Sequence, residues 1–337
     1  MEDISYWLPL VWAAILAIAV TLYVILDGFD LGLGILFPFA PEEERRDVMM
    51  NTVAPFWDGN ETWLVLGGGG LFVAFPKAYG IIMSGLYLPI IVMLLALVFR
   101  GVAFEFRWVS KPKHEFWDHA FTWGSIVASF AQGVVLGGLL QGIAVTDGQF
   151  SGGALDWLTP FALFCGFALV AGYALLGATW LIYKTEGPLE EFAREKARTA
   201  LIMVLVAGAI ISLWTPLAMD RVAERWFTMP NFLLLSPIPV LTALAAWKCW
   251  TGLEQKKQFQ PFAGAIALFL LGLIGLVISN VPYLVPASLT VWDAAAAPSS
   301  QMFMLVGTLL MLPVILGYTV FVYWTFRGKV RHGEGYH

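Results

Sequence analysis

Apolar segments long enough to cross a lipid bilayer follow one another along almost the whole chain, and this pattern limits the fold to a bundle of membrane helices. A helix needs about 20 apolar residues to span ~30 Å of hydrocarbon. Of the 337 residues 59% are hydrophobic and 13% are charged, about half the charged share of a soluble domain. We predict an all-α, single integral membrane domain over residues 1–337. Its nine helices lie at roughly 8–38, 53–75, 79–100, 119–143, 158–183, 200–218, 231–250, 262–283 and 302–326.

Basic residues are distributed unevenly between the loops. Of the 19 Lys and Arg residues, only Lys77, Arg221 and Arg225 fall on the N-terminal side of the membrane when the helices alternate. An excess of Lys and Arg marks cytoplasmic loops. The N-terminus is therefore predicted to be periplasmic and the C-terminus cytoplasmic, which requires an odd number of helices. The first segment follows Glu2 and Asp3 rather than basic residues, so we expect it to stay as a helix and not to be a cleaved signal peptide.

Four carboxylates lie inside the first two segments, where ionisable side chains are rare and costly. Asp27 and Asp30 belong to the first segment, and Asp58 and Glu61 to the second. Each pair is spaced to share a helix face. All four lie about 8–15 Å from the cytoplasmic edge, so we expect one cluster that Arg100, at the inner end of the third helix, partly neutralises. Clustered carboxylates away from water hold protons readily, because desolvation and like charge both disfavour ionisation.

This acid cluster has three interpretations. It is a relay for protons or cations, the coupling site of a proton- or cation-coupled secondary transporter, or a polar network that only fixes helix packing. Gly67–Gly70, in the second segment, would suit the discontinuous helix of a transporter. These glycines would equally permit tight helix packing, or make room for a lipid tail, a gas path or the edge of a cofactor. The acids lie off the membrane midplane and no inverted repeat is evident, which argues against a transporter.

Several chemistries lack their residues in this chain. A haem in the bilayer usually takes an axial histidine from a spanning helix. All four histidines fall in predicted cytoplasmic loops, at a helix edge or in the tail: His114, His119, His332 and His337. Cys165 and Cys249 form neither a disulfide framework nor a metal spacing, so we expect core cysteines and no metal site. The net charge of −5 provides no footprint for nucleic acid. The residues predict a conduit or a scaffold and not a redox centre.

The motifs resemble those of subunit II of the cytochrome bd-type quinol oxidases. The specific ones are DGFDLG at 27–32 and PFWDGNETWL at 55–64. The resemblance continues in order through FVAFP at 72–76, RGVAFEFR at 100–107, the segment 285–293 and FRGKV at 326–330. The length is similar to that of the shorter, cyanide-insensitive branch. The resemblance implies a bacterial inner-membrane complex that oxidises quinol and reduces O2 to water with protons from the cytoplasm.

The resemblance also implies a division of labour between subunits. Subunit I, the expected partner, carries two haems b, one haem d and the quinol-oxidising loop. Subunit II is its structural counterpart, with two four-helix bundles and a peripheral helix. Ubiquinone or menaquinone is the expected substrate, and some members also hold a quinone in subunit II as a structural ligand. Further expected partners are O2, membrane lipids and, as a candidate, a small single-helix subunit.

Roles for single residues follow from the same motifs. Trp57 and Asp58 match the tryptophan–aspartate pair at the end of a proton path that reaches the subunit interface. Glu105 matches an acidic position near the cytoplasmic mouth. Glu61 lies where some members carry a neutral glutamine, which argues against an obligatory relay. The resemblance implies proton uptake through Glu105, Asp27 and Asp30 towards Asp58 and Trp57. The full set of predicted path residues is Asp27, Asp30, Trp57, Asp58, Glu61, Arg100 and Glu105.

Overall fold

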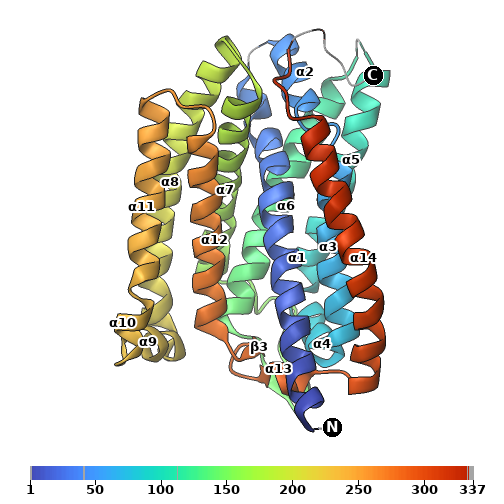
Figure 1. Cartoon of the computed structure of the whole chain (residues 1–337), viewed down its shortest axis with the longest axis vertical. Helices are drawn as coiled ribbons and strands as arrows, with labels where there is room; N and C mark the ends of the chain where they lie inside the picture. The colour runs from blue at the N-terminus through green and yellow to red at the C-terminus, as the bar shows by residue number, and fades with distance from the viewer. Residues whose placement is uncertain (1, 41, 112, 332, 334–337) are drawn as a thin grey trace.

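The computed structural model describes residues 2–40, 42–111, 113–331 and 333, which form a bundle of long helices with the two chain ends at opposite ends of the bundle (Figure 1). The long helices are α1 (Glu2–Leu36), α3 (Trp57–Ala74), α5 (Tyr87–Val109), α6 (Glu115–Gln141), α7 (Pro160–Lys184), α8 (Pro188–Ala218), α11 (Pro237–Glu254), α12 (Gln260–Asn280) and α14 (Pro298–Thr325). The short elements are η1 (Phe37–Phe39), α2 (Glu43–Asn51), α4 (Pro76–Gly85), α9 (Asp220–Phe227), α10 (Asn231–Leu235), α13 (Val291–Ala294) and two hairpins, β1–β2 (Val145–Thr146, Gln149–Phe150) and β3–β4 (Tyr283–Val285, Leu289–Thr290).

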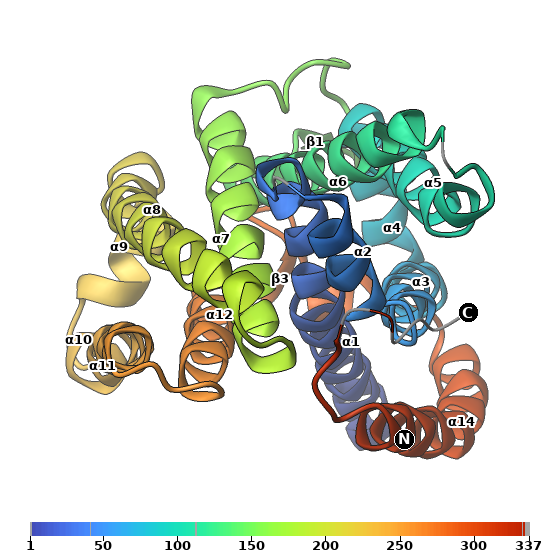
Figure 2. The same ribbon diagram turned by 90° about the horizontal axis from the view of Figure 1, so that it is seen from above.

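The helices pack as two groups of four with one helix at the edge. α1, α3, α5 and α6 form the first group, and α7, α8, α11 and α12 form the second (Figure 2). α7 packs against both α1 and α6 and so joins the groups, whereas α14 contacts α1 and α3 at the periphery. The expected all-α membrane fold is thus confirmed, and the grouping agrees with two four-helix bundles plus a peripheral helix.

Eight helical segments of the described chain are long and apolar enough to cross a membrane. α3, in the second predicted span, is not among them. It has 18 residues, and its first turns carry Asp58, Asn60 and Glu61, which lower its hydropathy. α3 nevertheless runs beside α1 and α14 within the bundle (Figure 1). Nine crossings therefore stay a prediction, as does the direction of the chain in the membrane.

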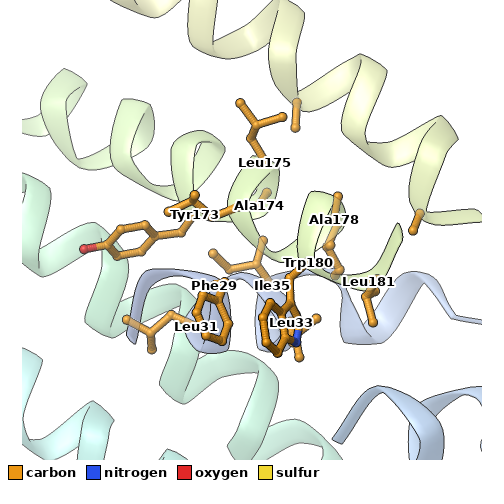
Figure 3. Packing of buried hydrophobic residues seen from close by; sticks show 14 of the residues in the cluster. Phe29, Leu31, Leu33, Ile35, Tyr173, Ala174, Leu175, Ala178, Trp180 and Leu181 are labelled. Carbon is orange, nitrogen blue, oxygen red and sulfur yellow. The ribbon is translucent and has the colours of Figure 1, made fainter. Parts of the chain in front are cut away.

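Close approach of α1 to α7 forms the centre of the molecule (Figure 3). A Cβ on Gly32 would lie 1.9 Å from the carbonyl oxygen of Tyr173 and 2.7 Å from the backbone nitrogen of Gly177. Only glycine permits this contact, as in other close pairs of membrane helices. One turn away, the ring of Phe29 stacks on Trp180 with centroids 4.2 Å apart. This rigid contact fixes the face of α1 that carries Asp27 and Asp30.

The predicted helix boundaries are wrong in five places. Pro55 precedes α3, which begins at Trp57 and not at 53. The segment 79–100 divides into α4 and α5, and Pro89 lies in the first turn of α5, where proline is well tolerated. α5 then continues to Val109, because Arg107 is buried against carboxylates and does not end the helix. The segment 231–250 divides into α10 and α11 before Pro237.

The fifth correction concerns the polar stretch 184–198, which lies between the predicted helices 158–183 and 200–218. These residues form the first turns of α8, which starts at Pro188 and not at 200. Leu189, Ala193, Ala197 and Leu201 repeat every four residues and are buried, so they hold the charged part of the helix against its neighbours. The remaining helix limits differ from those predicted by a few residues, and both cysteines are buried, as expected.

Candidate functional site

Arg100 of α5 is the centre of a buried charged cluster. Its Nη1 lies 2.9 Å from Asp27 Oδ1 and 2.6 Å from Glu61 Oε1, and its Nη2 lies 3.7 Å from Asp30 Oδ2. The side chains of Arg100, Asp27 and Asp30 are fully buried, whereas that of Glu61 is 26% exposed. One guanidinium thus faces three carboxylates, two sealed in the protein and one at the edge.

Glycines allow the helices to bring these groups together. On α6, a Cβ at Gly124 would lie 2.8 Å from the carbonyl oxygen of Ala96 and 3.0 Å from the backbone nitrogen of Arg100. α5 and α6 therefore touch beside the arginine. On α1, Gly28 and Gly32 face α7, while Asp27 and Asp30 face Arg100. The DGFDLG motif supplies both a packing face and a charged face.

Amide and phenol groups extend the cluster towards α14. The Asn60 side-chain amide donates to Asp30 Oδ2 at 2.7 Å, and the Tyr323 hydroxyl donates to Asn60 Oδ1 at 2.9 Å. Asp27 Oδ1 is paired with Arg100 Nη1, and Asp30 Oδ1 is buried without a hydrogen-bond partner among the described residues. Buried oxygens without a hydrogen-bond partner are rare in proteins, so each one has a specific structural or chemical reason.

A second chain of hydrogen bonds starts one helical turn before Asp27. Gln132 of α6 donates to the Tyr23 hydroxyl at 2.7 Å and accepts from the Tyr173 hydroxyl at 2.8 Å. It joins α1, α6 and α7 at three fully or largely buried polar side chains. Gln132 therefore ties helices together, as expected for a polar residue in a membrane helix.

The prediction that all four acids form one cluster is wrong, because Asp58 lies outside it. The side of α3 that packs on α1 is centred on Asn60 and Trp63, which are buried. At about 100° per residue, Asp58 points roughly 200° away from Asn60 and is exposed, whereas Glu61 lies on the flank and reaches Arg100. The spacing of Asp58 and Glu61 correctly predicts that both lie on one helix. It does not determine which face of α3 packs on α1.

Trp57 and Glu105 lie outside the buried cluster. The half-buried ring of Trp57 stacks on Phe104 with centroids 4.8 Å apart and an angle of 2° between the planes. Glu105, the next residue on α5, is exposed. The seven predicted residues therefore form a buried group, Asp27, Asp30, Glu61 and Arg100, and an outer group, Trp57, Asp58 and Glu105.

A second ion network, which the sequence did not predict, joins α2, the last turn of α5 and the first turn of α6. Arg107 is fully buried, with Asp47 Oδ1 at 2.5 Å and Asp118 Oδ1 at 2.6 Å. Lys111 also binds Asp47, and Arg46 binds Asp118. Partial burial alone would raise the pKa of Asp47, but the hydrogen bonds from Lys111 and Arg107 outweigh it and lower that pKa. Arg100 and Arg107 are seven residues apart on α5, so they lie on the same face of the helix two turns apart. This spacing is the sequence feature that could have predicted a second buried arginine.

The described histidines lie at the same end of the bundle. His114 is the residue before α6, and His119 lies in the first turns of α6 with an exposed side chain. Neither position fits an axial haem ligand inside the bilayer. His332 and His337 lie outside the described residues.

Comparison with known proteins identifies the family of the chain. Residues 8–326 match the family model described as cytochrome bd terminal oxidase subunit II. The chain belongs to this family. It is 30% identical to cytochrome bd-I ubiquinol oxidase subunit 2 of Escherichia coli K12, with 96% of this chain and 95% of the relative covered. It is also 30% identical to cytochrome bd ubiquinol oxidase subunit 2 of Bacillus subtilis 168, with 96% and 97% covered.

The fold agrees with this family. The bd oxidase structure from Geobacillus thermodenitrificans contains a chain with a TM-score of 0.80 at 16% identity, covering 95% of this chain and 98% of that one. Family membership and the eight apolar helices make this bd oxidase subunit a multi-pass inner-membrane protein and a component of a quinol oxidase complex. The prediction of the family is confirmed, whereas the roles of single residues stay predictions.

Proposed function

We propose that this chain is the haem-free subunit of a bd-type quinol oxidase, where it scaffolds subunit I and carries protons inward from the cytoplasm. The observation that carries the proposal is the position of Glu61. Its carboxylate is partly exposed, and through Arg100 it is joined to two carboxylates that are sealed inside the protein.

The charge balance of the cluster favours proton binding. With Asp27, Asp30 and Glu61 all ionised, Arg100 leaves two excess negative charges in a buried site. Desolvation and like-charge repulsion both oppose that state, so the site retains at least one proton. Arg100 lies between the acids, and it lowers the cost of the charge that appears when a proton leaves.

The outer residues provide the two ends of the route. Glu105 and Asp58 are exposed on the surface of the isolated chain, next to Phe104 and Trp57, whose rings stack on each other. In this route protons enter at Glu105, exchange with the buried pair through Glu61, and leave at Asp58 towards subunit I. Glu61 thereby links the exposed and the buried carboxylates in this route.

The surface that would meet subunit I lies on α3. Residues 58, 62, 65, 69 and 72 repeat at helical spacing and are exposed. Val65 is 72% exposed and Phe72 57% exposed. Of the glycine run, Gly70 packs on Leu16 of α1, but a Cβ on Gly68 or Gly69 would meet nothing within 4 Å. These two glycines offer a second helix a flat surface for close approach.

Redox cofactors and substrates belong to the partner in this proposal. The two haems b, the haem d and the quinol-oxidising loop are assigned to subunit I, because the described histidines of this chain do not fit a haem. Ubiquinol or menaquinol and O2 react there, and a small single-helix subunit is a further candidate partner. A secondary transporter is disfavoured by the fold, because α1 and α3 run unbroken through Asp27, Asp30 and Gly67–Gly70.

The test compares Asp58→Asn with Asp293→Asn in the purified complex, since Asp293 is an exposed residue of α13 far along the chain from the cluster. We expect Asp58→Asn to slow O2 reduction in proteoliposomes at least about tenfold with the haem spectrum unchanged, as loss of a positioned proton carrier does. Wild-type rates for Asp58→Asn would refute the exit assigned to it.

A further inference from the structure

A pocket of about 250 Å³ lies among α1, α7, α12 and α14 and takes no part in the proton route. It is at the end of the bundle where α7 and α14 finish, on the side where α12 and α14 flank α1 (Figures 1 and 2). Two cations, Lys184 and Arg327, belong to its lining. Its other walls are mainly aromatic: Phe29, Phe56, Trp180, Tyr183, Phe262 and Tyr323.

Trp180 presents an unused hydrogen-bond donor in this lining. Its side chain is 3% exposed and is held by Phe29 on one face. Among the described residues its Nε1 has no hydrogen-bond partner, although a buried indole N–H normally finds one. An acceptor oxygen of a bound molecule would satisfy it.

The cations of the pocket lack acidic partners. No carboxylate of the described chain lies within 4 Å of Lys184, Arg327 or the neighbouring Lys329. Lys184 donates to the carbonyl oxygen of Phe326 at 2.5 Å and lies over the ring of Trp180 at 5.4 Å. Lys329 donates to the carbonyl oxygens of Ile182 and Thr185, and burial lowers its pKa. Several positive charges at one membrane edge with no carboxylate in contact suit an anion.

We propose that this pocket binds an anionic phospholipid. The phosphate lies between Lys184 and Arg327, an oxygen of the glycerol ester region accepts from Trp180 Nε1, and an acyl chain fills the space between the aromatic walls. The position agrees with the physics of membranes, since basic residues at a helix end attract anionic headgroups. A neutral isoprenoid headgroup would satisfy the indole but would leave both cations unpaired. This proposal does not depend on the proton route.

The wall of the pocket touches the acid cluster. Tyr323 lines the pocket and donates to Asn60, which in turn donates to Asp30. A lipid that holds Tyr323 in place would therefore hold the amide that binds this buried carboxylate.

Native mass spectrometry of the delipidated complex tests the proposal, with phosphatidylglycerol, phosphatidylcholine and ubiquinone as separate probes. We expect phosphatidylglycerol to bind in preference to both others, and its affinity to fall about fivefold in each of Lys184→Gln and Arg327→Gln, the factor that ~1 kcal/mol per charge gives. Lys248→Gln is the matched control, because Lys248 is exposed on α11, lies outside the pocket and has no carboxylate within 4 Å in the described chain. Equal binding of phosphatidylglycerol and phosphatidylcholine, or preferred binding of ubiquinone, would overturn the proposal.

A second measurement needs no substitution and so does not depend on folding of a variant. Phosphatidylglycerol with a photoreactive acyl chain is added to the wild-type complex, and labelled peptides are mapped after illumination. Labelling concentrated on Ile266 and Tyr323, which line the pocket, is expected. Labelling spread evenly over the exposed faces of α8 and α11, with none in the pocket, would contradict the site.

Discussion

Arg100 and Glu61 form a 2.6 Å ion pair that joins the interior of the protein to its edge. The guanidinium is fully buried, and the carboxylate is the partly exposed member of the cluster. Behind Arg100 lie Asp27 and Asp30, neither of which is exposed. Arg100 therefore links the partly exposed carboxylate of Glu61 to the two buried carboxylates of Asp27 and Asp30.

Removal of the central cation is predicted to destabilise the chain strongly. Arg100→Met keeps the volume but leaves the buried carboxylates without a counter-charge, which costs about 3–5 kcal/mol when one partner of a buried pair is lost. Thermal unfolding of the complex in detergent measures this loss. Arg198→Met is the control, because Arg198 is a 41% exposed partner of Glu254, and such a surface pair contributes about 0–1 kcal/mol. Similar unfolding temperatures for both variants would contradict the importance of the cluster.

Gly32→Ala is predicted to disrupt the contact between α1 and α7. The new Cβ would lie 1.9 Å from the Tyr173 carbonyl oxygen, so the backbones must separate. Overpacking costs about 1–3 kcal/mol, and a clash with backbone belongs at the upper limit or above it. Limited proteolysis and the yield of folded protein report the effect. Gly208→Ala is the control, since nothing lies within 4 Å of that position on α8, and it should behave as wild type.

The exposed face of α3 is predicted to bind subunit I. Val65→Trp places a bulky apolar group on that face, which lipid tolerates but a close-packed partner does not. We expect the amount of copurified subunit I to fall severalfold. Val240→Trp makes the same change at a 58% exposed position of α11 and should leave the complex intact. Equal recovery of subunit I in both variants would show that the partner binds elsewhere.

Acid sensitivity is predicted for the network around Arg107. The pKa of Asp47 is lower in the folded protein than in the unfolded chain, so its contribution to stability is complete above the unfolded value of about 4 and is lost as the pH falls through the folded value. Asp47→Asn should therefore lower the unfolding temperature at pH 7, and the difference from wild type should shrink below about pH 4. Unfolding temperatures of the two proteins between pH 7 and pH 3 measure this. A constant difference over the whole range would exclude the carboxylate as its origin.

The sequence predicted the all-α membrane architecture, because repeated apolar segments of about 20 residues have one main physical meaning. It placed Asp27, Asp30, Glu61 and Arg100 in one cluster, because ionisable residues at one depth of neighbouring apolar segments gather together. The sequence did not predict that Asp58 is exposed, since the face of a helix that is buried depends on its neighbours and not on residue spacing alone. It also missed Arg107 with Asp47 and Asp118, because a buried ion network between α2, α5 and α6 reads in sequence as ordinary loop charges.

The most direct measurement of the central claim is the rate of proton uptake from the cytoplasmic side during O2 reduction by the complex that carries Glu61→Gln. Glutamine keeps the shape and hydrogen bonding of this residue but carries no exchangeable carboxyl proton. We expect a decrease of about 10²-fold, the lower range for a positioned proton carrier, with normal haem content and normal recovery of subunit I. Glu224→Gln, an exposed glutamate of α9, should keep the wild-type rate. A wild-type rate for Glu61→Gln in an intact complex would contradict the route.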